Sequence, residues 1–182
     1  MAKSRRKARE AALRALYQID VGQITTLAGL LDMREQTDLA PDLWDYAEQL
    51  VKGVQGNGDE IDTLISECLI DWELDRIAVV DRNVLRIATF ELLHVSAMPP
   101  AVSINEAIEL AKKYSTAESG KFVNGVLGRL LAETPKANWD PSMGESPEEP
   151  AAEEAVAEEE VSPEQAEDML KVGLWKVRKD VE

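Results

Sequence analysis

The stretch DRNVLRIATFELLHV, residues 81–95, decides the fold class of this chain. Apolar residues recur in it at the spacing of one broad helical face, namely Val84, Leu85, Ile87, Ala88, Leu92 and Val95. A helix with so wide an apolar surface must be covered from several sides. We therefore predict that this segment is the central and most buried helix of a bundle.

Narrower apolar stripes of helical period lie on both sides of this segment. They are Ala8/Ala12/Ala15/Leu16/Ile19, Leu43/Ala47/Leu50/Val51/Val54, Ile61/Leu64/Ile65/Cys68, Ile104/Ala107/Ile108/Ala111 and Val123/Val126/Leu127/Leu130. Each stripe must be buried against a neighbouring helix. No alternating apolar and polar run indicates a strand. The chain is therefore predicted to be all-α, a compact bundle of about seven short helices.

Glycines and capping patterns predict where some of these helices begin and end. Gly56-Asn57-Gly58 is expected to end one helix, because glycine tolerates the backbone of a helix terminus. Asn57 is expected to cap the helix that follows. Ser103 and Glu106 form the pattern of a capping box, which predicts a helix start at Ile104.

The 182 residues carry a formal net charge of −15, and this charge is unevenly spread. Residues 134–182 hold 5 Lys and Arg against 14 Asp and Glu, whereas residues 1–16 hold six bases and one acid. Residues 134–161 are rich in proline and glutamate, so we predict an acidic, disordered linker there. Residues 162–182 carry the apolar residues for one short amphipathic helix, namely Met169, Leu170, Leu174, Trp175 and Val177. The predicted folded domain is residues 1–133.

A single cysteine, Cys68, and a single histidine, His94, exclude several classes of protein. One cysteine cannot form an internal disulfide, so we expect a cytoplasmic protein. The two residues cannot build a structural zinc site, and no nucleophile motif accompanies His94. The sequence contains no apolar run of about eighteen residues, no signal-peptide pattern and no Gly-rich phosphate loop. We therefore predict no membrane span, no metal, no cofactor and no enzymatic activity.

The most prominent local feature is the basic run KSRRKARE, residues 3–10, which leads into the first helix. Cations at a helix N-terminus oppose the helix dipole, so local stability does not explain them. An external polyanion does explain them, because guanidinium groups match phosphate. A merely solvated terminus is the other interpretation, and composition leaves both open. The candidate phosphate contacts are Arg5, Arg6, Lys7 and Arg9.

Two aromatic residues lie where they would assist the binding of single-stranded RNA. Bases of a single strand stack on aromatic rings, while cations follow its backbone. Tyr17 follows the basic run by two to three helical turns, and Phe122 lies one position off the last apolar stripe. By spacing alone both rings fit a core role better, because aromatic residues are often part of the core, and the RNA-stacking role is the alternative.

Two other charged regions have two interpretations each. The otherwise apolar central helix carries the charged residues Asp81, Arg82 and Arg86. One interpretation is that they form buried ion pairs, and the other is that they face a partner. The acidic tail, residues 134–182, either keeps the protein in solution or competes with RNA for the basic run. A competing tail would weaken RNA binding most at low salt.

Three blocks of the chain resemble the NusB family of transcription antitermination proteins. They are RRKAREAALRALYQID (residues 5–20), DRNVLRIATFELL (81–93) and VSINEAIELAKKYSTAESGKFVNGVLGRL (102–130). The resemblance extends from Arg5 to about Leu131 and implies two packed helical bundles. It further implies a protein that binds the single-stranded boxA element of nascent ribosomal RNA transcripts together with NusE, a ribosomal small-subunit protein. Such a pair joins elongating RNA polymerase and suppresses premature termination.

The same resemblance implies roles for individual residues. The positions that match the RNA-binding motifs of the family are Arg5, Arg6, Lys7, Arg9, Tyr17, Glu118, Lys121 and Phe122. The region that faces NusE in the family corresponds to Asp75, Asp81 and Arg82. The acidic tail is not part of the family pattern, so the resemblance implies nothing about it.

Two other classes of function are weighed against this one. A NusB-like domain also opens some RNA cytosine methyltransferases, but only 49 residues follow residue 133 and they contain no cysteine. A protein-binding adaptor with an incidental basic run is the second alternative. Binding of boxA-type RNA, measured against a scrambled sequence, separates an RNA-binding protein from such an adaptor.

Overall fold

The computed structural model describes residues 5–140, and within that range it contains seven α-helices and no strand. The helices are α1 (Arg5–Gly22), α2 (Thr26–Gln36), α3 (Pro41–Gly56), α4 (Gly58–Cys68), α5 (Val79–His94), α6 (Pro100–Tyr114) and α7 (Ala117–Ala132), with a 3₁₀ turn η1 (Leu74–Arg76) before α5. The prediction of an all-α fold with about seven helices is therefore confirmed. The predicted helix at residues 162–182 and most of the predicted linker lie outside the described residues.

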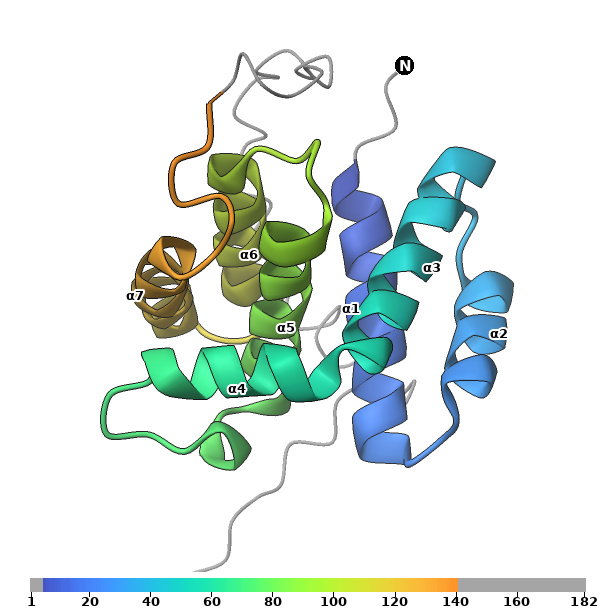
Figure 1. Ribbon diagram of the computed structural model, residues 1–182. Helices are drawn as coiled ribbons and strands as arrows, with labels where there is room; N and C mark the ends of the chain where they lie inside the picture. Colours follow the sequence, from blue (N-terminus) through green and yellow to red (C-terminus); the bar gives the residue numbers. More distant parts are fainter. Residues whose placement is uncertain (1–4, 141–182) are drawn as a thin grey trace, which may run out of the picture. The chain divides into compact units, whose positions relative to one another are not determined.

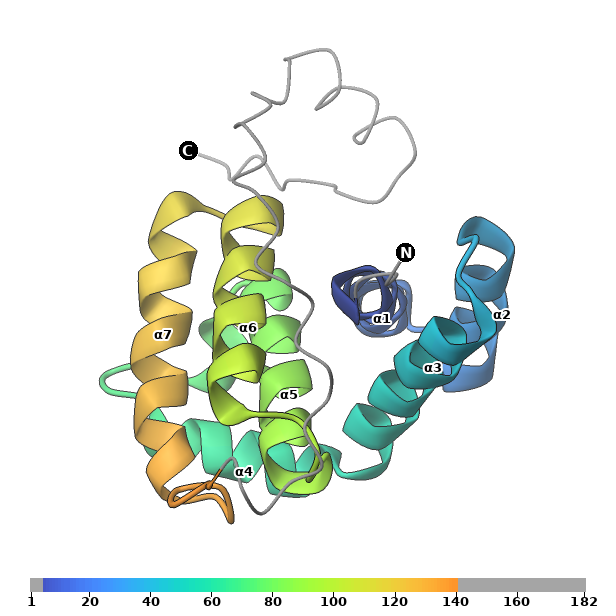
Figure 2. The same cartoon turned by 90° about the horizontal axis from the view of Figure 1, so that it is seen from above.

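The helices form two groups around the central helix α5. Helices α1, α2 and α3 pack on one another on one side, whereas α4, α6 and α7 lie on the other (Figures 1 and 2). Helix α5 contacts α1, α3, α4, α6 and α7. Its residues Val84, Leu85 and Leu92 are completely buried. The breadth of the apolar surface at residues 81–95 therefore predicted the centre of the core correctly.

Helices α3 and α5 approach each other closely at Gly53. A Cβ atom on this glycine would lie 2.1 Å from Cζ of the Phe90 ring. Phe90 is itself buried, so a close-packed interior leaves its ring little room to move away. The absence of a side chain at Gly53 is what allows the first group of helices to pack on α5.

The charges on α5 form ion pairs that connect three helices. Arg86 donates to both carboxylate oxygens of Asp62 on α4, at 2.7 Å each, and to Asp20 on α1 at 2.9 Å. Burial lowers the pKa of Arg86, but these carboxylates more than offset burial and the pKa lies above its ordinary value. Arg82 also lies 3.5 Å from Asp20. The sequence left open whether Arg82 and Arg86 form ion pairs or face a partner. The structure shows that both form ion pairs.

One predicted helix start is wrong, whereas Asn57 precedes α4 as predicted but makes no side-chain capping bond to it. Helix α6 begins at Pro100, one turn earlier than predicted, because Pro99 and Pro100 hold the backbone dihedral that a helix start needs. Ser103 therefore lies inside α6, where it is buried and forms no capping box. Asn57 donates its side-chain amide to the carbonyl of Gly53 at 2.7 Å. It therefore closes α3 and makes no side-chain cap for α4.

Residues 134–140 continue the packed structure beyond the expected domain boundary. The ammonium of Lys136 is buried and donates at 2.6–2.8 Å to the carbonyls of Glu91 and Val95 at the end of α5 and of Met98 in the following turn. A cation is favoured there because the C-terminus of a helix is the negative end of its dipole. Burial lowers the pKa of Lys136 to about 8. Composition did not reveal this contact, because one lysine does not alter the overall character of a Pro- and Glu-rich segment.

Candidate nucleic-acid interface

Residues 5–10 of the basic run form the start of α1, and three of the cations in this described part reach solvent. Arg5, Arg6 and Lys7 are all exposed. The guanidinium of Arg5 lies over the ring of Tyr46, 5.4 Å from its centroid, a cation–π distance. The first turn of α1 contains no acidic residue. This end of the helix therefore has the exposed positive charge that the predicted contact with a polyanion requires.

Arg9 belongs to the same run but points into the protein. Its side chain is 3% exposed, and its Nε donates to Glu91 Oε1 at 2.7 Å. The hydroxyl of Tyr46 donates to the same carboxylate. Burial lowers the pKa of Arg9, yet Glu91 more than offsets burial and the pKa lies above its ordinary value. The structure contradicts the predicted phosphate contact of Arg9, because a buried guanidinium committed to an internal carboxylate is not available to RNA.

Arg6 connects α1 to α6 at the surface. Its Nε and Nη2 donate to the two carboxylate oxygens of Glu106, at 2.9 and 2.8 Å. A second pair joins Lys113 of α6 to Glu10 of α1, with Nζ and Oε1 3.0 Å apart. Arg6 precedes Glu10 on α1, and their partners Glu106 and Lys113 follow in the same order on α6. The two helices therefore run in the same direction here.

Tyr17 lies on the same side of α1 as Arg6 and Glu10. Positions 6, 10 and 17 fall within about 40° of one another on a helix of 3.6 residues per turn. The ring of Tyr17 is half-buried. We name this surface the α1–α6 face and define it by Arg6, Glu10, Tyr17, Glu106 and Lys113. Figure 2 shows α1 between α6 and α3, on the side of the described helices away from α4.

The start of α7 presents the remaining predicted RNA contacts. Thr116 and Ser119 form a capping box, with Ser119 N donating to Thr116 Oγ1 at 3.2 Å and Thr116 N to Ser119 Oγ at 3.3 Å. The box fixes the first turns of α7, on which Glu118 and Lys121 are exposed and Phe122 is half-buried. Glu118 and Lys121 form an ion pair at 3.4 Å. The sequence analysis missed this box because the residue at its N3 position, Ser119, is a serine rather than the usual glutamate or glutamine.

The three residues predicted to face a protein partner lie in different environments. Asp75, in η1, is exposed. Asp81 is buried and accepts a hydrogen bond from Ser119 Oγ at 2.8 Å, so a partner cannot touch it directly. Arg82 is half-buried beside Asp20. Of the three side chains, only that of Asp75 is exposed to solvent.

An exposed apolar pair next to η1 was not predicted. Ile70 and Trp72, in the loop after α4, are 61% and 58% exposed. Large apolar side chains exposed together are typical of interaction surfaces, where aromatic residues are enriched. The only signal in the sequence was that these two residues belong to no helical stripe. Together with Asp75 they make the loop a candidate partner surface.

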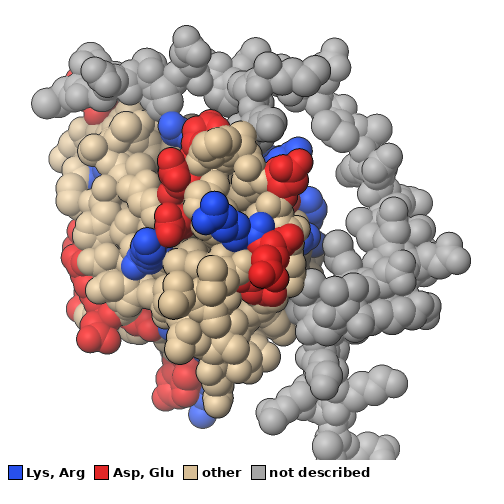
Figure 3. Space-filling view, turned by 90° about the vertical axis from the view of Figure 1, so that its right-hand side faces the viewer, with Lys and Arg blue, Asp and Glu red and all other residues tan. Residues whose placement is uncertain are grey.

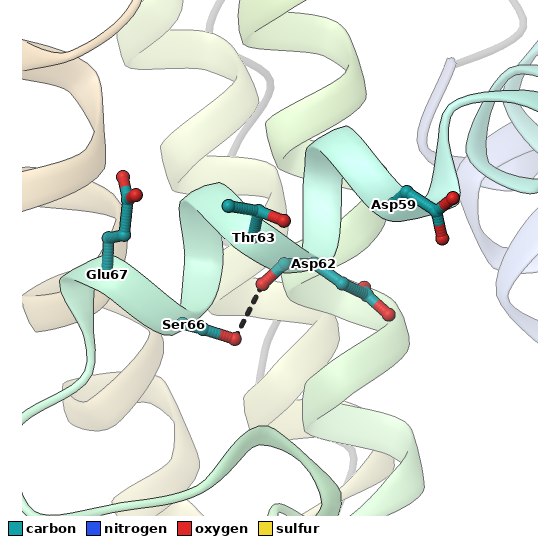
Figure 4. A pocket seen from close by; sticks show the side chains of 5 residues that line it. All are labelled: Asp59, Asp62, Thr63, Ser66 and Glu67. Atoms are coloured by element: carbon teal, nitrogen blue, oxygen red, sulfur yellow. Dashed lines mark hydrogen bonds between the residues drawn. The ribbon is translucent and has the colours of Figure 1, made fainter.

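A shallow hollow lies over one side of α4. Its lining side chains all come from that helix (Figure 4): Asp59, Asp62, Thr63, Ser66 and Glu67. Three of the five are acidic, which disfavours a phosphate backbone. Residues 5–140 contain no group of three side chains suited to a metal ion. In the same range, no helix combines the length and the apolar character that a membrane crossing requires.

The side of the molecule formed by α2 and α3 has mixed character. Figure 3 shows basic and acidic side chains interspersed there, with a largely uncharged lower half. Leu27 and Leu31 of α2 are exposed. Because opposite charges alternate, no continuous positive field runs over it. The α1–α6 face and the start of α7 carry the residues predicted to contact RNA, and we take them as the candidate nucleic-acid interface.

Comparisons with known proteins agree on one family. The family model of the NusB family matches residues 6–132. Transcription antitermination protein NusB of Bacillus subtilis (strain 168) is 44% identical over 129 residues, which span 71% of this chain and 95% of that protein. The solved structure of T. maritima NusB is 41% identical with a TM-score of 0.69, and covers 75% of this chain and 97% of its own. A structure of antitermination factors NusB and NusE in complex with dsRNA is 30% identical, with a TM-score of 0.68 over 73% of this chain and 99% of the matched one.

Proposed function

The chain belongs to the NusB family, and from that premise we propose that it is an RNA-binding transcription antitermination factor. Its proposed ligand is the single-stranded boxA element of nascent ribosomal RNA transcripts, bound together with NusE. The assembly then joins elongating RNA polymerase in the cytoplasm and suppresses premature termination. The role is one of binding and needs neither catalysis nor a cofactor.

The observation that supports RNA binding most directly is the similarity to a NusB chain solved with NusE and dsRNA. The described residues supply suitable chemistry on α1 and α7. Arg6 and Lys7 provide exposed cations on α1, and Lys121 provides another on α7. Tyr17 and Phe122 provide partly exposed rings. Cations combined with aromatic rings are what proteins use to hold a single strand.

The rings favour a single strand over a duplex as the ligand. Proteins bind an A-form duplex mostly through phosphates and 2′-hydroxyls, for which aromatic rings are not needed. A single strand exposes base faces that stack on rings such as those of Tyr17 and Phe122. We therefore expect this chain to prefer single-stranded RNA over a duplex of the same sequence.

We place the NusE contact on the loop that carries Ile70 and Trp72 and on the adjoining Asp75. These residues combine exposed apolar area with a charge, and all three lie outside the α1–α6 face. Asp81 acts indirectly, because its carboxylate holds Ser119 at the start of α7. Arg82 contributes through its ion pair with Asp20. RNA and protein would then bind different parts of the surface.

The decisive experiment measures RNA binding by fluorescence anisotropy at a stated salt concentration, because affinity depends steeply on salt. The labelled ligands are boxA-type RNA, a scrambled strand of the same composition and the corresponding duplex, each with and without NusE. We expect the single-stranded boxA-type RNA to bind most tightly, and NusE to tighten it further. Equal binding of the scrambled strand would contradict the proposal. NusE binding without any RNA binding would favour the protein-binding adaptor.

A further inference from the structure

The α1–α6 face contains an acidic residue at the point where the proposed RNA site needs a cation. Glu106 accepts two hydrogen bonds from the guanidinium fork of Arg6. This bidentate arrangement is the one that arginine also makes with a phosphate. The Arg6 side chain is 47% exposed, whereas that of Glu106 is 17% exposed. The guanidinium therefore reaches solvent while its fork is already occupied by a carboxylate from the protein itself.

Glu106 is held in place by a second arginine. Its carboxylate lies 3.8 Å from Nη1 of the buried Arg9. Glu10 and Glu109 add further negative charge near Arg6. Arg6 is thus a surface cation surrounded by acids of α1 and α6, and the nearest of these acids is anchored from the protein interior.

We propose that Glu106 is an internal competitor of RNA phosphate for Arg6, and that it thereby limits the affinity of the RNA site. The inference rests on the proposed RNA-binding function. In the free protein the carboxylate holds the guanidinium in an ordered position. When RNA binds, a phosphate oxygen replaces the carboxylate oxygens on Arg6, and Glu106 keeps its contact with Arg9.

The exchange is physically reasonable because surface ion pairs contribute little to stability. A phosphate can therefore displace Glu106 from Arg6 without unfolding α1 or α6. Arg9 prevents the displaced carboxylate from becoming an unpaired, partly buried charge. The remaining penalty is repulsion between this carboxylate and the incoming phosphate. Removing the charge of Glu106 removes that penalty and leaves the cation in place.

The test compares Glu106→Gln with Glu109→Gln, each of which removes one negative charge from α6. Glu109 is the matched control, because it is bonded to Lys112 at 2.8 Å rather than to Arg6. RNA affinity is measured for the full chain with boxA-type RNA over a range of salt concentrations. We expect Glu106→Gln to tighten binding roughly three- to tenfold and Glu109→Gln to change it much less. The salt slope should change by less than about 0.7, the value for one phosphate on a single strand, because Arg6 binds a phosphate both with and without the Glu106 charge.

A second pair of variants asks whether the gain depends on Arg6. In an Arg6→Ala background, Glu106→Gln should give no further gain, because the competition no longer exists. Equal gains from the two glutamines, or a gain that persists without Arg6, would overturn the inference. Glu106→Asp keeps the charge and withdraws it from Arg6, so it should give a smaller gain in the same direction. Thermal melting checks that each variant is folded, and absence of RNA binding by the unmodified chain would instead refute the proposed function.

Discussion

Arg6 and Arg9 lie three residues apart on one helix, yet they belong to different parts of the protein. Arg9 is buried with Glu91 and Tyr46, where it joins α1 to α5 and α3. Arg6 lies at the surface with Glu106, where it joins α1 to α6. Both make a two-pronged contact with a glutamate. The difference is that water can reach one pair and not the other.

This difference shows how one basic run serves two purposes. A buried charge is tolerated only when it is paired, and breaking the pair leaves its partner uncompensated. An exposed pair can exchange one of its members for another ion at little cost. Arg9 is therefore a structural cation, whereas Arg6 is the cation that we propose exchanges its carboxylate for a ligand. Variants at these and neighbouring positions test this division, from the largest expected effect to the smallest.

The largest expected difference is in the free energy of unfolding when each arginine is replaced separately. We expect Arg9→Met to lower the free energy of unfolding by about 3–5 kcal/mol, because it leaves the Glu91 carboxylate buried without its cation. Arg6→Met should lower it by about 1 kcal/mol or less. Urea denaturation of both variants measures the difference. Equal losses of stability would mean that burial does not distinguish the two pairs.

The two phenylalanines offer a similar contrast between core and surface. Phe90 is buried against Gly53, so Phe90→Ala should cost about 3–5 kcal/mol of stability. Phe122 is half-buried at the start of α7, so Phe122→Ala should cost less stability but roughly 1–3 kcal/mol of RNA affinity. Melting curves and RNA titrations of both variants check this. If Phe122→Ala is as destabilising as Phe90→Ala, Phe122 is a core residue and does not stack on a base.

Removing the exposed cations of the basic run should change RNA binding and leave the fold intact. Arg5→Ala with Arg6→Ala is expected to flatten the salt dependence of binding by about 0.7 for each phosphate that the protein no longer binds. The control is Arg34→Ala with Arg76→Ala, which also removes two exposed cations but from α2 and η1. An identical slope in both double variants would show that only the net charge matters.

The acidic tail is expected to oppose the basic run. Lys136 donates to the carbonyls of Glu91 and Met98, and Arg9 of α1 bonds to the side chains of the same two residues, so the tail is joined to the core at residues that α1 also contacts. A tether of this kind gives an effective concentration on the order of millimolar. We therefore expect deletion of residues 141–182 to tighten RNA binding several-fold at low salt and by less at high salt. Unchanged affinity at low salt would leave the solubilising role as the better interpretation.

The smallest effect concerns the pH dependence of the surface pair. Burial raises the pKa of Glu106, but the hydrogen bond and charge of Arg6 more than offset burial, and the pKa lies below its ordinary value. A carboxylate with a lowered pKa stabilises the fold above its ordinary pKa, and this stabilisation is lost as the pH falls through the lowered one. Wild type should therefore exceed Glu106→Gln in stability by about 1 kcal/mol or less at pH 7. The gap should narrow as the solution becomes more acidic than pH 4.5, and a constant gap in denaturation curves would argue against the pair.

Local pattern predicted most of the helices because helix formation depends on residues three and four positions apart. The segment at residues 81–95 shows this best, since its breadth of apolar residues indicated both a helix and its central place. Pattern is least informative for residues 21–40, where it assigns no element. Helix α2 lies there and has apolar residues on both sides, with Leu30 buried and Leu31 exposed. Such a helix has no single stripe to recognise.

The sequence by itself therefore determined that this chain is all-α, where its central helix lies and that α1 begins with a basic run. The tertiary structure decided which cations of that run are exposed to solvent and which are buried. The partners that distinguish them, Glu91 and Glu106, lie 82 and 100 residues from Arg9 and Arg6 in the chain. Only folding brings these carboxylates to α1. Since burial changes how strongly an ion pair is held, the same residue type becomes a structural element in one position and a proposed RNA contact in the other.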